Sequence, residues 1–168
     1  MTSTSFPAPD IKPEDLPRLR IVAVNGAAGR IVAPDWLAKA EAVHRQLRPL
    51  LPADYVAKMG RVFADGGRMC VAVVGDDVAG VAVYRVFENT VYGVHMYVDD
   101  LITDQTQRST GVGKALLEHL QDLARLAGCA RFTLDSGTQR QQAHKFYFRE
   151  GLVVSGFHFE CGLTQGGV

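Results

Sequence analysis

The segment from Arg108 to Lys114, Arg-Ser-Thr-Gly-Val-Gly-Lys, has the residue types and spacing best suited to chemistry in this chain. It follows an apolar run at 101–103 and opens a stretch in which leucines and alanines recur every three or four residues, as on one face of a helix. A turn between a strand and a helix N-terminus presents unpaired backbone N–H groups and the positive end of the helix dipole. The segment is therefore predicted to bind an anion such as a phosphate group.

Two common nucleotide-binding motifs do not fit this turn. The Walker loop places Ser or Thr after its lysine as a magnesium ligand, whereas Ala115 follows Lys114 here. The dinucleotide fingerprint G-x-G-x-x-G begins at Gly111 and Gly113 but has Leu116 at the position of its third glycine. What remains is the shorter pattern Arg-x-x-Gly-x-Gly.

Composition and charge limit the classes of protein to which this chain can belong. Its 168 residues are 47% hydrophobic, enough for one core of ordinary size, and 18 basic residues balance 18 acidic ones. This balance argues against general binding to nucleic acid or to anionic membranes. No run reaches the ~20 apolar residues of a membrane span, and the N-terminus lacks the features of a signal peptide. Cys70, Cys129 and Cys161 are widely spaced, so we expect reduced core residues, no metal site and a cytoplasmic protein.

The expected elements alternate between strands and helices, which predicts a mixed α/β fold. Residues 1–17 contain four prolines and are expected to form a flexible arm, followed by a single domain at 18–168. Strands are expected at 18–24, 69–74, 78–87, 91–103, 130–136 and 152–160, and helices at 35–48, 52–63, 111–127 and 138–150. The helix at 111–127 should make the strands on either side of it parallel neighbours, with the Gly111 turn at the mouth of a cleft.

The pair Asp99-Asp100 is poorly suited to the interior of a predicted strand, because a buried carboxylate is costly without a partner. Adjacent strand residues point to opposite faces, so both carboxylates can face one cleft only if a β-bulge intervenes. This pair therefore needs a structural explanation.

Two motifs together resemble the Gcn5-related N-acetyltransferase (GNAT) family. The first consists of Leu101-Ile102-Thr103 and the Arg-x-x-Gly-x-Gly loop. The second is Ala143-His144-Lys145-Phe146-Tyr147-Phe148-Arg149-Glu150-Gly151-Leu152, similar to a later helix of the family, and the resemblance covers residues 18–160. It implies a central, mostly antiparallel mixed sheet flanked by helices, in which the fourth and fifth strands are parallel and splayed apart.

The resemblance implies acetyl-coenzyme A as cosubstrate. The loop N–H groups would hold its pyrophosphate, and the splayed strands would free backbone groups for its pantetheine arm. The backbone at Leu101 would polarise the thioester carbonyl. The implied cofactor-binding residues are Leu101, Ile102, Thr103, Arg108, Ser109, Thr110, Gly111, Val112, Gly113, Lys114 and Ser136.

Two catalytic residues also follow from the resemblance. Asp100 directly precedes Leu101, where the family often has an acidic residue, and is the candidate base that deprotonates the amine. An ordinary Asp pKa of ~3.9 makes a weak base, so this role needs burial, a raised pKa or a relay water. Tyr147 matches the family residue that serves as general acid toward the leaving thiolate. The alternative is that Asp100 only caps loop N–H groups and Tyr147 only packs in the core.

The expected reaction is acetyl transfer to the primary amine of a small molecule. The segment 142–151, with Phe157-His158-Phe159, is similar to the branch that contains aminoalkylphosphonate acetyltransferases. Two alternatives stay open at this point: acetylation of proteins or peptides, and a non-catalytic acyl-coenzyme A sensor. The family resemblance is also compatible with a homodimer.

Overall fold

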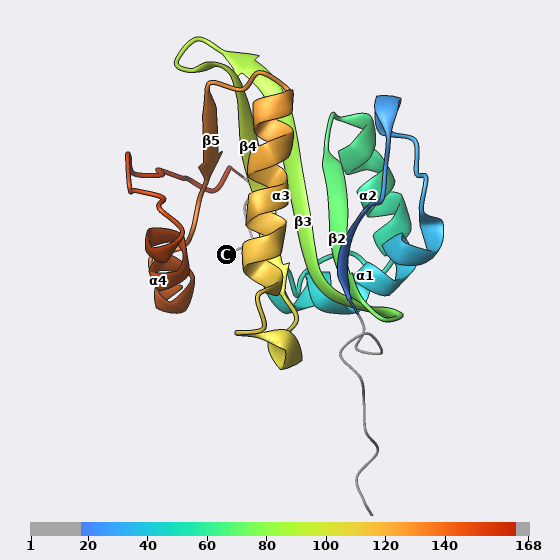
Figure 1. Ribbon diagram of the computed structural model, residues 1–168. Helices are drawn as coiled ribbons and strands as arrows, with labels where there is room; N and C mark the ends of the chain where they lie inside the picture. Colours follow the sequence, from blue (N-terminus) through green and yellow to red (C-terminus); the bar gives the residue numbers. More distant parts are fainter. Residues whose placement is uncertain (1–17, 164–168) are drawn as a thin grey trace, which may run out of the picture.

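The computed structural model describes residues 18–163 and shows one five-stranded sheet in the order β1-β2-β3-β4-β5 (Figure 1). The strands are β1 (Leu19–Ala23), β2 (Arg68–Val74), β3 (Asp77–Asn89), β4 (Gly93–Thr103) and β5 (Arg131–Leu134). The pairings from β1 to β4 are antiparallel, and β4 pairs with β5 in parallel. This arrangement confirms the predicted fold class. The predicted arm at 1–17 lies outside the described residues.

Helices cover both faces of the sheet, because β2 and β3 are apolar on both faces. The helices are α1 (Pro34–Leu47), α2 (Tyr55–Ala64), α3 (Val112–Leu126) and α4 (Gln141–Arg149). Side chains alternate along a strand, so Val71 and Val81 pack with α1 and α2 while Ala72 and Ala82 pack with α3. Figure 1 shows α3 in front of the sheet and α4 beyond β5. The sheet thus has a helix layer on each side.

A β-bulge at Asp99 interrupts the regular register of β4. Val98 pairs with Tyr84 and Asp100 pairs with Val83, so Asp99 has no partner of its own in β3. An extra residue shifts the alternation of side chains by one position. Both carboxylates accordingly line the same cavity, which explains the acidic pair in this strand.

Beyond the bulge, β4 and β5 separate. Their pairing runs only from His95 opposite Arg131 to Val98 opposite Leu134. The amide of Asp104 donates to the carbonyl oxygen of Ala79 on β3 at 2.8 Å. Because β3 and β5 lie on opposite sides of β4, the main-chain groups of residue 104 point away from β5. Because these groups alternate in direction along a strand, those of residues 101 and 103 point toward β5, which no longer pairs there. The predicted splayed strand pair is therefore present.

Two sequence predictions fail. The expected strand at 152–160 is absent: residues 152–163 form neither helix nor strand, and Val153, Phe157 and Phe159 are exposed. Alternating apolar residues form a strand only where a neighbouring strand pairs with them, and none pairs with them within the described residues. Cys70 is buried as expected, but Cys161 is exposed and is not a core residue.

None of the helices within residues 18–163 has the length and apolar character needed to span a membrane.

Candidate active site

The predicted anion-binding loop lies between the C-terminal end of β4 and the N-terminus of α3. Gly111, the residue before α3, has a φ of 91°, and a Cβ added there would meet nothing within 4 Å. Ser109 also has a positive φ, of 64°. No hydrogen bond within residues 18–163 has a backbone amide between Arg108 and Lys114 as its donor. The loop thus offers open backbone donors at a helix N-terminus, as an anion site requires.

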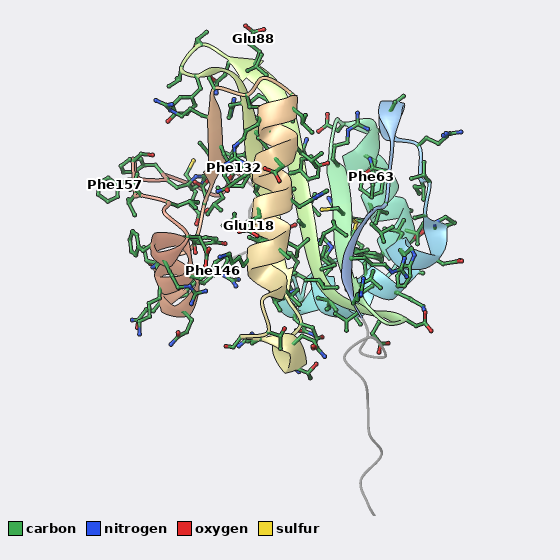
Figure 2. All side chains as sticks on the ribbon, viewed as in Figure 1. Phe63, Glu88, Glu118, Phe132, Phe146 and Phe157 are labelled. Carbon is green, nitrogen blue, oxygen red and sulfur yellow. The ribbon has the colours of Figure 1, made fainter. Side chains whose placement is uncertain are left out.

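Gly113 faces a narrow space between β4 and α4. A Cβ on Gly113 would lie 3.1 Å from Oγ1 of Thr103 and 3.6 Å from Cζ of Phe146. Figure 2 shows Phe146 on α4 pointing toward α3. Phe146 is part of the motif seen in the sequence but was not predicted as a site residue. A glycine here leaves room that any side chain would fill.

Some side chains of the loop already have partners within the described part of the chain, unlike the loop amides. The Thr110 hydroxyl donates to the carbonyl oxygen of Gln107 at 2.6 Å, so that proton is already used inside the loop. Nζ of Lys114 lies 3.7 Å from Oε1 of Glu118, and Arg108 is exposed. The backbone, more than these side chains, therefore defines the site.

Ser136 lies just beyond β5, where β5 has parted from β4. Its hydroxyl oxygen is buried and has no hydrogen-bond partner within the described residues. A buried hydroxyl without a partner costs free energy, so such an atom needs an explanation.

Asp100 is held from two sides by residues of the α1 region. Its Oδ2 lies 3.0 Å from Nε2 of His44, and its Oδ1 accepts from Nε of Arg48 at 2.6 Å. Nδ1 of His44 in turn lies 3.0 Å from the hydroxyl of Tyr55 on α2. His44 and Tyr55 are both about 1% exposed. These contacts form a continuous hydrogen-bonded chain from the core to β4.

These contacts decide the protonation state of Asp100. Burial raises the pKa of its carboxyl, but the hydrogen bonds from His44 and Arg48 and their electrostatic attraction to the carboxylate together outweigh burial and hold that pKa below its usual range. A raised pKa was one of the conditions under which Asp100 would act as a base. The carboxyl is largely buried, which meets another of these conditions, yet its pKa moves in the opposite direction.

A cavity of about 550 Å³ lies between α1, α2 and the bulge in β4. Leu47, Leu51 and Met59 form apolar walls, and Asp99 and Asp100 lie at the sheet side. Oδ2 of Asp99 accepts from Nε of Arg85 at 2.8 Å. A volume of this size is typical of pockets for small molecules.

Tyr147 is half-buried on α4, with its ring centroid 5.4 Å from that of Phe146. Burial raises the pKa of its phenol above the ordinary value, although nearby Arg140 lowers it in part. The phenol is therefore protonated at neutral pH, which is the state that a general acid needs. Figure 1 shows that α4 faces α3 across the side of the sheet where β5 ends.

His44 and Tyr55 are the functional candidates that sequence reasoning missed. His44 appears in the sequence on the predicted apolar face of the first helix, together with Ala40 and Val43. A histidine on an apolar helix face is a sequence signal for a buried polar contact, but the sequence does not identify the partner, because Asp100 is 56 residues away. Only the fold brings the two side chains together.

A sequence model of the acetyltransferase (GNAT) family matches residues 34–151. The chain belongs to this family. The matched range begins at the start of α1 and runs through α4, so it includes the glycine loop of this GNAT protein, its β-bulge and Tyr147.

Two curated proteins are similar to part of this GNAT chain. YhdJ, an uncharacterized N-acetyltransferase of Bacillus subtilis, is 41% identical over 68 residues, which are 40% of this chain and 48% of that protein. The aminoalkylphosphonate N-acetyltransferase of Salmonella typhimurium is 34% identical over 66 residues, 39% of this chain and 43% of that protein. The chain thus spans about half the length of the curated relatives it matches.

Solved structures share the fold over most of the chain. The structure of AAC(6')-Iy in complex with the bisubstrate analogue CoA-S-monomethyl-acetylneamine has a TM-score of 0.68 and is 18% identical. The likeness covers 86% of this chain and 99% of that one. At this level of identity the comparison establishes the fold of the GNAT family in this protein.

Proposed function

We propose that this protein is an N-acetyltransferase that transfers the acetyl group of acetyl-coenzyme A to the primary amine of a small molecule. The observation that carries the proposal is the loop from Arg108 to Lys114, whose open amides follow the end of β4 that no longer pairs with β5. Names of similar proteins support it: two are N-acetyltransferases, and AAC(6')-Iy was solved with a coenzyme A analogue.

The residues present fit acetyl-coenzyme A. The amides from Arg108 to Lys114 would hold its pyrophosphate, with space for close approach at Gly111 and Gly113. The backbone of residues 101–103 and the Ser136 hydroxyl would bond the pantetheine arm between the strands. The acetyl-coenzyme A thioester supplies an acyl carbon that an amine attacks, with loss of the thiol as its carbon–sulfur bond breaks.

The Leu101 amide is the proposed donor to the thioester carbonyl oxygen. Alternation along β4 directs this N–H toward the side on which β5 no longer pairs. A fixed donor at that position would stabilise the negative charge that develops on the oxygen during attack.

Asp100 is the proposed carboxylate of the acceptor site. Most of a free primary amine is protonated at neutral pH, so it would arrive as an ammonium ion attracted to Asp100. Because the pKa of Asp100 is lowered, the carboxylate would stay ionised, and we assign the ammonium proton to bulk solvent by way of a water held beside the carboxylate, which leaves a neutral amine able to attack. Tyr147 would then donate its phenolic proton to the departing thiolate and recover one from solvent.

The cavity beside Asp100 supports a small acceptor. Its walls come from α1, from α2 and from the segment that connects them, and its volume suits a compact molecule more than a polypeptide segment. The similarity to an aminoalkylphosphonate N-acetyltransferase makes aminoalkylphosphonates a rational first choice among amines.

The test is a panel of acceptors incubated with acetyl-coenzyme A, with thiol release and product mass as readouts. The panel includes an aminoalkylphosphonate, aliphatic amines, an aminoglycoside and a peptide with a free N-terminus, with an amine-free reaction as control. We expect turnover of at least one small amine. Turnover of the peptide alone would overturn the acceptor class, and acetyl-coenzyme A binding without turnover of any acceptor would overturn the enzymatic proposal.

A further inference from the structure

A buried chain of side chains runs from the core to the candidate acceptor cavity. It passes from the Tyr55 hydroxyl to Nδ1 of His44 over 3.0 Å, and from Nε2 of His44 to Oδ2 of Asp100 over 3.0 Å. Neither Tyr55 nor His44 has been given a role in acetyl transfer. Buried polar side chains linked in series are costly unless every member is satisfied, so the chain calls for a function.

The donors and acceptors of this chain fit one arrangement. A neutral phenol must give its proton to an acceptor, and Nδ1 of His44 is the acceptor that faces it among the described residues. If Nδ1 accepts, the proton of a neutral imidazole is on Nε2, and Nε2 then donates to Asp100. A protonated imidazole would donate to the Tyr55 oxygen and leave the phenolic proton without a partner within residues 18–163. The Nε2–H tautomer therefore satisfies all three groups, and it presents a donor that favours the ionised carboxylate.

We propose that His44 and Tyr55 are positioning residues, which together hold Asp100 as an oriented carboxylate facing the acceptor cavity. Tyr55 selects the imidazole tautomer, and His44 fixes one carboxylate oxygen. The use of this carboxylate for an amine acceptor rests on the proposed function, whereas the arrangement itself can be tested without any acceptor.

The other charged groups around Asp100 do not replace His44. Arg48 contacts the opposite carboxylate oxygen, but its side chain is 53% exposed, so solvent screens its charge, whereas the hydrogen bond from His44 comes from a buried side chain. The remaining charged groups lining the cavity are Lys58 from α2, Arg85 from β3 and Asp99 from β4, and Glu41 and Arg45 from α1 lie near Tyr55. Arg85 is occupied by Asp99 at 2.8 Å.

The direct test is the titration of the Asp100 carboxyl carbon by ¹³C NMR in the free protein, with Asp100→Asn used for assignment. We expect His44→Leu to raise the pKa of Asp100 by about 1 to 2 pH units, because the mutation removes one hydrogen bond to a charged group. His44→Gln keeps a neutral amide donor and should restore part of the shift. Tyr55→Phe should raise this pKa by a smaller amount. Without the phenol, the imidazole proton can move from Nε2 to Nδ1, but His44 is still able to donate to Asp100.

The matched control is His95→Leu, which removes the other buried histidine of the described chain without touching Asp100. Loss of packing alone would lower the thermal stability of both leucine variants, so thermal stability cannot distinguish a packing role of His44 from control of Asp100. The titration of Asp100 distinguishes these two roles. An unchanged Asp100 titration in His44→Leu, or an equal shift in His95→Leu, would overturn the proposal. If His44→Leu does not fold, the same comparison is made with Tyr55→Phe, for which an unchanged titration is equally decisive.

A second readout connects the chain to turnover. The acid limb of the kcat/KM profile should move to higher pH in His44→Leu by the same amount as the NMR titration, because Asp100 must be ionised to attract the ammonium group. If no amine is turned over, the proposed function fails while the NMR result still decides whether His44 and Tyr55 control Asp100. A shifted NMR titration with an unshifted acid limb would overturn the link between this chain and catalysis.

Discussion

His44 on α1 and Asp100 on β4 are joined by a contact of 3.0 Å between Nε2 and Oδ2, although 56 residues separate them in the chain. The contact ties the helix layer to the bulged strand at the edge of the candidate acceptor cavity. Because it holds the pKa of Asp100 low together with Arg48, the same contact affects both the stability of the fold and the charge of the site.

Acid sensitivity should expose the contribution of Asp100 to stability. A carboxyl whose pKa is lower in the folded state stabilises the protein fully above its unfolded pKa of ~3.9, and this stabilisation is lost as pH falls through the folded pKa. We expect Asp100→Asn to lower the free energy of unfolding by about 1 to 3 kcal/mol at neutral pH and by progressively less below about pH 4. Urea unfolding at a series of pH values measures this difference. A deficit that stays constant down to pH 2 would show that the ionised carboxylate is not the source.

Replacing Tyr147 with Phe should separate catalysis from cosubstrate binding. Loss of a general acid typically costs about 10²-fold or more in rate, whereas the aromatic ring and its packing are kept. We expect kcat to fall by roughly that factor and the Kd for acetyl-coenzyme A to change by less than about 2-fold. Steady-state kinetics and calorimetry provide the two values. Phe148→Leu changes an exposed neighbour on the same helix and serves as control; an unchanged kcat in Tyr147→Phe removes the phenol from the mechanism.

Adding one methyl group at Gly113 should weaken binding of acetyl-coenzyme A. The new Cβ would lie 3.1 Å from Thr103 Oγ1 and would occupy the space beside the loop amides. We expect a rise in Kd of about 10-fold, equivalent to roughly 1.4 kcal/mol, measured by calorimetry. Gly60→Ala is the matched control, because Gly60 lies in α2 with nothing within 4 Å of its added Cβ. Equal Kd values for the two alanine variants would argue against a cosubstrate site at Gly113.

Removal of the Ser136 hydroxyl should have opposite effects on the free and the bound protein. In the free protein the buried oxygen has no partner within the described residues, so Ser136→Ala should raise the free energy of unfolding by up to about 1 kcal/mol. If the hydroxyl bonds the cosubstrate, the same variant should bind acetyl-coenzyme A several-fold more weakly. Thermal unfolding with and without acetyl-coenzyme A measures both effects, and Ser155→Ala in the exposed C-terminal segment is the control. A Ser136→Ala variant that binds with unchanged affinity would exclude this contact.

The sequence predicted most of the fold because local patterns report burial on a helix or strand face. Leucines at every third or fourth position predicted α3 with nearly its observed bounds. The acidic pair in β4 raised a bulge only as a condition for both carboxylates to face one cleft, and the structure shows that bulge. The same local information was misleading at 152–160, where alternating apolar residues lack a partner strand among the described residues.

The candidate site was predictable where it depends on backbone, and less so where it depends on contacts between distant residues. The glycine turn and the helix start after it could be predicted from spacing, because an open helix N-terminus is a local feature, although the family resemblance also needed the second motif at 143–152. The role of His44 could not, because a histidine at an apolar helix position looks the same whether it packs or bonds to a carboxylate on another element. The direction of the Asp100 pKa shift likewise depends on two partners that the fold supplies.

The single additional residue at Asp99 sets two geometries at once. It turns the next amides of β4 toward the opening beside β5, and it brings two neighbouring acidic side chains to the opposite layer of the molecule. The bulge therefore aligns the backbone that would hold the acyl group with the carboxylate that His44 of α1 and Tyr55 of α2 orient. Most of the other cavity-lining residues come from α1, α2 and the segment between them, so substitutions there, other than at His44, would change the fit of the acceptor and leave the backbone that would hold the acyl group intact.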